Sequence, residues 1–279
     1  MPYKTILVHC DAGGMAANRA RVAADLAVRF GARLVGIHVC AQFTPPPFLE
    51  GGSAMDALYH SYQEQARTGE AAATAAFQTA AAGKDLSTEW RSVYGWTTEE
   101  ISVHARYADL IVVGQHDPAE TPKITPAGLP ETIALSTGRP VLVTPHIGVS
   151  ASPGKNILLC WNASREAARA AADAMPFLTA AEKVVVLAID AKPSAKGHGA
   201  EPGADVAAWL ARHGASVTVQ RDTAVDSDVG NLIVSRAADF VSDMIVMGVY
   251  GHSRMREVVL GGASRTLLAS LTVPALIAH

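Results

Sequence analysis

Short apolar runs recur along the chain and alternate with amphipathic stretches. The runs at 6–11 (ILVHCD), 32–40 (ARLVGIHVC), 109–114 (DLIVVG) and 140–145 (PVLVTP) are apolar at most positions. Runs of this kind are typical of parallel strands that are buried on both faces. The stretch at 16–30 instead carries its apolar residues at the spacing of one helix face. The pattern therefore predicts an α/β fold, with a twisted parallel sheet covered by helices on both faces.

The same order of elements occurs twice. In the first half we expect strands at 6–11, 32–40, 88–95, 109–114 and 140–145, and helices at 16–30, 61–82 and 131–137. In the second half we expect strands at 157–162, 183–190, 216–220, 244–248 and 274–278, and helices at 164–175, 205–214, 232–240 and 263–271.

An internal repeat supports this division. KTILVHCD at 4–11 matches KNILLCWN at 155–162, an offset of 151, whereas ADLIVVG at 108–114 matches SDMIVMG at 242–248, an offset of 134. The offset changes after the second strand, where the segment 41–62 of the first half is longer than the corresponding segment 192–203 of the second half. We predict two tandem domains, at 1–147 and 154–279, joined near 146–154 by a segment rich in Gly, Ser and Pro. The Pro-rich insertion around 43–53 is expected to be an exposed loop, with a partner surface or a lid as the alternative.

Composition narrows the function classes. A chain of 279 residues with 49% apolar and 18% charged residues can bury two cores. A net charge of -3 argues against nucleic-acid binding, and the lack of an apolar run of about 20 residues argues against a membrane span. The first residues read as a strand, so we expect a cytoplasmic protein. Three dispersed cysteines argue against a disulfide framework.

Four glycines near the carboxyl end have the spacing of an anion-binding loop. Gly248 and Gly251 are followed after nine residues by Gly261 and Gly262, and a helical run begins at Ala263. Glycine lets the backbone approach an anion closely. The free amides and the dipole at a helix start favour negative charge. The pattern predicts a ligand that carries phosphates.

Two strands of the second half end where such a ligand would bind. Ligands of open α/β sheets lie beyond the carboxyl ends of the strands, where the strand order reverses. Asn162 ends the first strand and Gly248 the fourth, so the two face one crevice if these strands are neighbours. The candidate binding residues are Cys160, Trp161, Asn162, Met247, Gly248, Gly251, His252, Gly261, Gly262, Ala263 and Ser264, with Asp11 at the corresponding strand end of the first half.

The loop GVYGHSRMREVVLGGAS, with a strand before it and a helix after it, resembles the nucleotide loop of the universal stress protein family in its tandem form. The resemblance covers essentially the whole chain. It implies two Rossmann-like domains of the adenine nucleotide alpha hydrolase-like type, each an open five-stranded parallel sheet of order 3-2-1-4-5. It also implies ATP, with or without Mg²⁺, held between the first and fourth strands. The two domains would pair through their last strands as an intramolecular pseudo-dimer. Neither a homodimer nor the protein partners can be read from the sequence.

Each half departs from the family pattern. ATP-binding members usually carry an aspartate at the end of the first strand, where the first half has Asp11 and the second has Asn162. The hydroxyl residue expected after the third glycine is replaced by Gly262, with Ser264 two positions on. In the first half Asp117 replaces the second glycine of the loop, which should repel a triphosphate. We therefore expect the nucleotide mainly in the second half.

Most of these residues also have a purely structural interpretation. The glycine pairs can serve a tight turn and close helix packing, Asn162 can cap the helix near Ser164, and Trp161 can be a half-buried core aromatic. His252 and Ser253 are further candidates for phosphate contacts, whereas the charges of Arg254 and Arg256 are more typical of a solvated loop.

Other chemistries find little support. GKDLS at 83–87 lacks the glycine spacing of a Walker loop, and no dinucleotide fingerprint follows the first strand of either half. No Cys or His pair has metal-ligand spacing. The leading hypothesis is a non-enzymatic ATP-binding protein of the stress response, acting as a nucleotide-dependent switch or sensor. A slow ATP hydrolase and a partner-binding stress module without nucleotide are the alternatives.

Overall fold

The computed structural model describes residues 2–44, 53–120, 125–194, 197–224, 228–249 and 262–279. The first half contains β1 (Thr5–His9), α1 (Ala16–Phe30), β2 (Arg33–Ala41), α2 (Ser53–Ala81), β3 (Thr88–Gly95), α3 (Thr97–Ala105), β4 (Leu110–Gly114), α4 (Leu129–Thr137) and β5 (Val141–Thr144). The second half contains β6 (Asn156–Cys160), α5 (Arg165–Asp173), α6 (Met175–Leu178), β7 (Lys183–Ile189), α7 (Ala204–Arg212), β8 (Val217–Asp222), α8 (Val229–Asp239), β9 (Met244–Gly248), α9 (Gly262–Ala269) and β10 (Ala275–Ala278).

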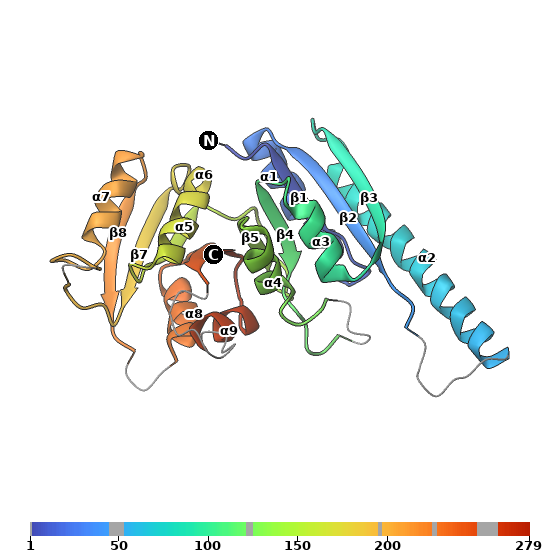
Figure 1. Ribbon diagram of the computed structural model, residues 1–279. Helices are drawn as coiled ribbons and strands as arrows, with labels where there is room; N and C mark the ends of the chain where they lie inside the picture. Colours follow the sequence, from blue (N-terminus) through green and yellow to red (C-terminus); the bar gives the residue numbers. More distant parts are fainter. Residues whose placement is uncertain (1, 45–52, 121–124, 195–196, 225–227, 250–261) are drawn as a thin grey trace.

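The strands of both halves form one sheet. Its order is β3-β2-β1-β4-β5-β10-β9-β6-β7-β8, so each half has the predicted order 3-2-1-4-5. Pairing is parallel within each half, whereas β5 and β10 pair antiparallel, with Leu142 opposite Leu276. The two last strands thus cover each other at the centre of the molecule (Figure 1), as the resemblance implied for an intramolecular pseudo-dimer. Neither strand is left as an open sheet edge.

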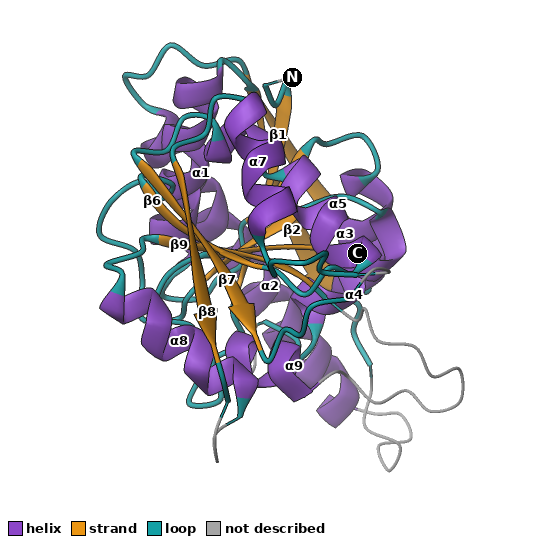
Figure 2. Ribbon diagram, turned by 90° about the vertical axis from the view of Figure 1, so that its left-hand side faces the viewer, coloured by secondary structure: helices purple, strands orange, loops and turns teal. Residues whose placement is uncertain are grey.

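Helices cover both faces of the sheet (Figure 2), which confirms the predicted α/β class. On one face, residues of α1, α2, α5, α6 and α7 pack against strand residues such as Val8 and Leu159. On the other face, residues of α3, α4, α8 and α9 pack against residues such as Leu7 and Leu158. Successive strand residues therefore enter opposite cores, which explains why these strands are apolar at nearly every position. Among the described residues, no helix is long and apolar enough to cross a membrane.

The segment between the halves is fixed on α1. The backbone of Val149 exchanges two hydrogen bonds with the side chain of Asn18, each 2.9 Å long. Below it, the rings of Tyr3, Phe30 and Phe177 pack with centroids 5.0–5.7 Å apart. These contacts join the first helix of the first half to α6 of the second half. The Gly, Ser and Pro composition of the connection therefore does not make it a free tether.

One helix was not predicted, and several predicted helix boundaries differ from the structure. α3 was not expected, and α2 begins at Ser53 where the prediction placed Ser61. The first turns of α2 are mostly exposed, so they lack the apolar periodicity that reveals a buried helix face. The predicted helix at 164–175 ends at Asp173, and the short α6 follows with Pro176 in its first turn. α8 begins at Val229, three residues before its expected start, because Asp228 caps it.

Candidate functional site

The strand order reverses in each half between its first and fourth strands. β1 lies between β2 and β4, and β6 lies between β7 and β9. In the second half Leu159 is in register with Val246, so the chain leaves β6 toward Asn162 beside the point where β9 ends at Gly248. The two strands are neighbours, as the crevice hypothesis required. The corresponding positions of the first half are Asp11 and Gly114.

Gly248 is required for the packing of α5. A Cβ atom at this residue would lie 2.3 Å from the carbonyl carbon of Glu166 and 2.4 Å from the amide nitrogen of Ala167. The backbone of the first turn of α5 thus lies directly against the end of β9. Gly248 does not have a left-handed φ, so close approach, and not a tight turn, explains the glycine. This packing also keeps the start of α5 at the crevice.

Asn162 shapes the turn that leads into α5. Its Oδ1 accepts a hydrogen bond from the amide of Ser164 at 3.1 Å, and the Ser164 hydroxyl accepts one from the amide of Ala167 at 3.1 Å. Ser164 is therefore the N-cap of α5, and the capping role suggested for Asn162 is wrong. Between them, Ala163 has a φ of 57°. The Asn162 side chain holds this turn in place at the mouth of the crevice.

The neighbours of these two residues belong to the cores. Cys160 and Met247 are 9% and 6% exposed and lie in the apolar cluster that α8 and α9 cover. Burial raises the pKa of the Cys160 thiol to about 12, so it stays protonated at neutral pH. Trp161 is half-buried and packs on the opposite core, which agrees with its structural interpretation. Packing thus accounts for these three side chains.

The carboxylate of Asp228, which was not predicted from the sequence, lies beside the start of α9. Asp228 caps α8 by accepting a hydrogen bond from the amide of Gly230 at 2.8 Å. Its Oδ2 would lie 3.9 Å from a Cβ atom at Gly262, the first residue of α9. In the first turn of α9, Gly262 is exposed, Ala263 is half-buried and Ser264 is 7% exposed. An Asp before an apolar run is an N-cap signal, which could have revealed the cap but not its position beside α9.

Part of the predicted loop lies outside the described residues. Gly251, His252 and Gly261 fall there, together with the residues between them. In the second half the structure therefore brings Asn162 and Gly248 to neighbouring strand ends, and these two residues, with the loop and the start of α9 that follow Gly248 in the sequence, define the candidate site.

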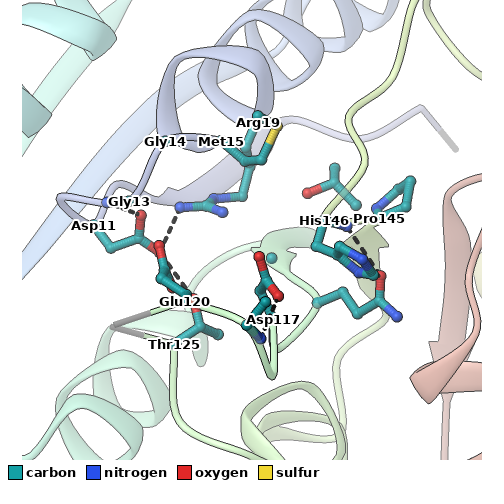
Figure 3. Close-up of a pocket in the computed structure, with 14 residues that line it drawn as sticks. Asp11, Gly13, Gly14, Met15, Arg19, Asp117, Glu120, Thr125, Pro145 and His146 are labelled. Carbon is teal, nitrogen blue, oxygen red and sulfur yellow. Dashed lines mark hydrogen bonds and ion pairs between the residues drawn. The ribbon is translucent and has the colours of Figure 1, made fainter. Parts of the chain in front are cut away.

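The crevice of the first half is a cavity of about 250 Å³ whose centre is a buried ion pair (Figure 3). Arg19 Nη2 lies 2.7 Å from Asp11 Oδ2, and the two side chains are 3% and 7% exposed. The Thr125 hydroxyl donates to the same oxygen at 3.1 Å, and the amide of Gly13 donates to Oδ1 at 3.0 Å. Arg19 Nε also donates to the carbonyl of His9 at 2.7 Å. Three donors of the protein itself, from Arg19, Thr125 and Gly13, therefore bind the Asp11 carboxylate.

Electrostatics fixes the charge state of this crevice. Burial by itself would raise the pKa of Asp11, but the charges of Arg19 and His9 and the hydrogen bonds from Arg19 and Gly13 hold that pKa well below its usual range. Burial also lowers the pKa of His9 to about 4 against the opposing effect of Asp11. At neutral pH the crevice thus contains a charged Asp11–Arg19 pair beside a neutral imidazole.

The guanidinium of Arg19 lies in the space that a side chain at Gly114, the first glycine of the degraded loop, would occupy. A Cβ atom at Gly114 would lie 2.3 Å from Arg19 Nη1. Asp117 and Glu120 also line this cavity, so it holds three carboxylates and one guanidinium. Like charges at short range would oppose a triphosphate. The described residues of the chain contain no group of three or more Asp, Glu, His or Cys side chains arranged to hold a metal ion.

One side chain links the first crevice to the second half. Gln115 follows β4 and is 5% exposed. Its Nε2 donates to the carbonyl of Leu268 in α9 at 2.9 Å, and its Oε1 accepts from the amide of His146 at 3.0 Å. The first crevice, which Gln115 lines, is therefore in direct contact with α9 of the second half.

Comparisons with known proteins agree with this architecture. The sequence profile described as the universal stress protein family matches residues 2–145 and 154–279. A universal stress protein from Archaeoglobus fulgidus DSM 4304 shares 15% identity and a TM-score of 0.71, over 98% of this chain and 95% of that one. A functionally unknown protein from Pseudomonas aeruginosa PAO1 shares 16% identity and a TM-score of 0.56, over 99% and 92% of the two chains. A putative universal stress protein from Pseudomonas aeruginosa UCBPP-PA14 gives the same identity and TM-score, over 99% and 93%. No curated protein matches the chain.

Proposed function

The chain belongs to the universal stress protein family, and on that premise we propose that it binds an adenine nucleotide such as ATP in the crevice of its second half. It would act in the stress response as a nucleotide-dependent switch or sensor and not as an enzyme. The observation that carries this proposal is the adjacency of β6 and β9, because it supports a crevice between Asn162 and Gly248, the residue after which the glycine loop follows in the sequence.

The contrast between the two crevices favours the second half. In the first crevice Asp11 is neutralised by Arg19, whose guanidinium lies against Gly114. In the second, the equivalent strand end carries the uncharged Asn162, and the position that aligns with Asp117 is Gly251. A polyphosphate would therefore meet fewer carboxylates in the second crevice.

Asp228 gives a reason to expect Mg²⁺ with the nucleotide. A phosphate at the start of α9 would lie near this carboxylate, and the repulsion would weaken binding. Mg²⁺ is commonly bound through one or two carboxylates together with substrate phosphates. Asp228 is the residue that would hold it, and the ion would offset the repulsion. We therefore expect ATP to bind more tightly with Mg²⁺ than with EDTA.

The hydrogen bond from Gln115 to α9 suggests how nucleotide binding in the second half could affect the first half. A nucleotide at the start of α9 would stabilise this helix, and α9 is hydrogen-bonded through Leu268 to the first half. A ligand shifts a conformational equilibrium by its difference in affinity for the two states. Binding in one half would in this way alter the contact between the halves.

Calorimetry and thermal unfolding with ATP test the proposal on the wild type and two matched variants. Gly251→Asp adds to the second crevice the charge that Asp117 brings to the first. Gly14→Asp adds a carboxylate to the first crevice, where a Cβ atom at residue 14 would meet no described residue within 4 Å. ATP at 100 times its Kd should stabilise the wild type by about 2.7 kcal/mol.

We expect Gly251→Asp to abolish this stabilisation and Gly14→Asp to retain it. The reverse pattern would assign the nucleotide to the first crevice. A wild type that binds neither ATP nor another adenine nucleotide would refute the proposal and favour the partner-binding alternative. Release of ADP during the titration, lost in Gly251→Asp, would instead identify a slow hydrolase.

A further inference from the structure

A further cavity lies away from both crevices, at the carboxyl ends of β2 and β3. Its volume is about 840 Å³. It exists because α2 has 29 residues and is about 43 Å long, whereas β2 has nine residues and is about 30 Å long. The first turns of α2 therefore extend past the sheet (Figure 1). The space between these turns and the strand ends is lined by side chains that serve neither hydrophobic core.

Four aromatic side chains from three elements line this cavity. Phe43 follows β2, Tyr59 and Tyr62 belong to α2, and Tyr94 belongs to β3. The Phe43 ring lies 5.4 Å from that of Tyr59 at an angle of 73°, and 5.2 Å from that of Tyr62 at 50°. The rings are thus steeply inclined to one another, as in a cage and not a flat stack. Tyr94 is 75% exposed and Tyr59 is 44% exposed, so these rings remain accessible. Exposed apolar clusters of this kind are typical of binding sites.

A carboxylate lies on the same face of α2. Glu70 follows Ala66 by one helical turn, Ala66 follows Tyr62 by one turn, and all three line the cavity. Glu70 is half-buried, and its carboxylate makes no ion pair or hydrogen bond with any residue that the structure describes. Burial and the charge of Glu70 both raise the pKa of the Cys40 thiol, which indicates that the carboxylate is close to the end of β2.

Among the described residues that line the cavity, the one cationic side chain is mostly exposed to solvent. Arg67 is 81% exposed, and its Nη1 lies 3.8 Å from the carboxylate of Glu64, which is 71% exposed. An exposed pair at this distance contributes little energy and is well hydrated. Arg67 therefore does not neutralise Glu70. A half-buried negative charge among aromatic rings would attract a cationic ligand and repel an anionic one.

We propose that the cavity formed by Phe43, Tyr59, Tyr62, Tyr94 and Glu70 is a binding site for an organic cation of the quaternary-ammonium type. Aromatic faces attract cations through their quadrupole, and cages of Tyr, Trp and Phe recognise alkylated ammonium groups. Glu70 supplies the counter-charge. The volume falls within the usual range for small-molecule sites and exceeds what a trimethylammonium group needs, so the ligand carries a further substituent.

The test compares choline with its uncharged isostere 3,3-dimethylbutan-1-ol on the full chain, by calorimetry and by ¹H NMR of the ligand methyl groups. The two molecules have the same shape, so the difference between them isolates the charge. We expect choline to bind with a Kd of about 1 mM or tighter, and the isostere to bind roughly tenfold more weakly.

Two pairs of variants assign the site. Tyr62→Leu and Glu70→Gln should each weaken choline binding by about fivefold or more. Tyr107→Leu changes a tyrosine that is 83% exposed and does not line the cavity, and Glu64→Gln changes an exposed carboxylate of the same helix. Both controls should bind choline as the wild type does. Circular dichroism checks that all four variants are folded.

The proposal is overturned if choline fails to bind, if the isostere binds equally well, or if folded Tyr62→Leu and Glu70→Gln proteins bind choline normally. It is also independent of the nucleotide hypothesis. Gly251→Asp should retain choline binding, and Tyr62→Leu should retain any binding of ATP.

Discussion

Replacing Arg19 with methionine would leave the Asp11 carboxylate buried without its counter-ion. The side chains of Arg19 and Asp11 are 3% and 7% exposed, so bulk water solvates the carboxylate poorly once the guanidinium that lies 2.7 Å from Asp11 Oδ2 is removed. Removing one partner of a buried pair typically costs about 3–5 kcal/mol, because an uncompensated charge remains in a medium of low polarity. We expect Arg19→Met to lower the free energy of unfolding by this amount.

The measurement is urea unfolding at pH 7, followed by far-ultraviolet circular dichroism. Asn at position 11 can still accept a hydrogen bond from the Gly13 amide through its oxygen, and its NH2 group can donate to the Thr125 hydroxyl, so the double variant Arg19→Met/Asp11→Asn should recover most of the loss. Lys155→Met is the matched control, since Lys155 is 71% exposed and lies 3.7 Å from Glu182. It should change stability by less than about 0.5 kcal/mol.

The pH dependence gives a second readout of the same pair. The pKa of Asp11 is lower in the folded than in the unfolded chain, so the carboxylate contributes stability above its unfolded pKa of about 3.9. That contribution is lost as the pH falls toward the folded pKa. The reasoning is refuted if Arg19→Met costs less than about 1 kcal/mol, or if the double variant is no more stable than the single one.

Two further predictions concern His9 and Gly248. Burial lowers the pKa of His9 from 6.5 to about 4, so the unfolded chain takes up a proton that the native protein does not. The free energy of unfolding should therefore fall by about 3 kcal/mol between pH 6.5 and pH 4. His9→Gln should reduce this pH dependence. A variant with the same pH dependence as the wild type would contradict the assignment of the effect to His9. Gly248→Ala should lower the free energy of unfolding by about 1–3 kcal/mol, because its Cβ atom would overlap the backbone of Glu166 and displace α5. Gly262→Ala, whose Cβ atom would meet no described residue closer than 3.9 Å, is the control, and equal losses in urea unfolding would count against the packing argument.

Local patterns determined the elements and their repetition. The side chains of strands such as 110–114 and 244–248 are buried on both faces of the sheet. A strand buried on both faces is apolar at nearly every position, and this can be recognised in the sequence. The order 3-2-1-4-5 came from the resemblance carried by the glycine loop, and the strand pairing confirms it. α3 escaped prediction because its buried residues, Ile101, Ser102 and Ala105, include one large apolar side chain, which is too few for a visible apolar period.

The contents of the sites depend on tertiary structure. That Arg19 would reach Asp11 and lie against Gly114 follows from how α1 packs across β1 and β4, not from the spacing of these residues. The aromatic cavity likewise combines residues around 43, 59–70 and 94, which meet because α2 is longer than the strands it covers. Hydrophobic periodicity is a local property that the sequence displays directly, whereas the partners of a buried charge or an exposed ring are set by elements distant in the chain.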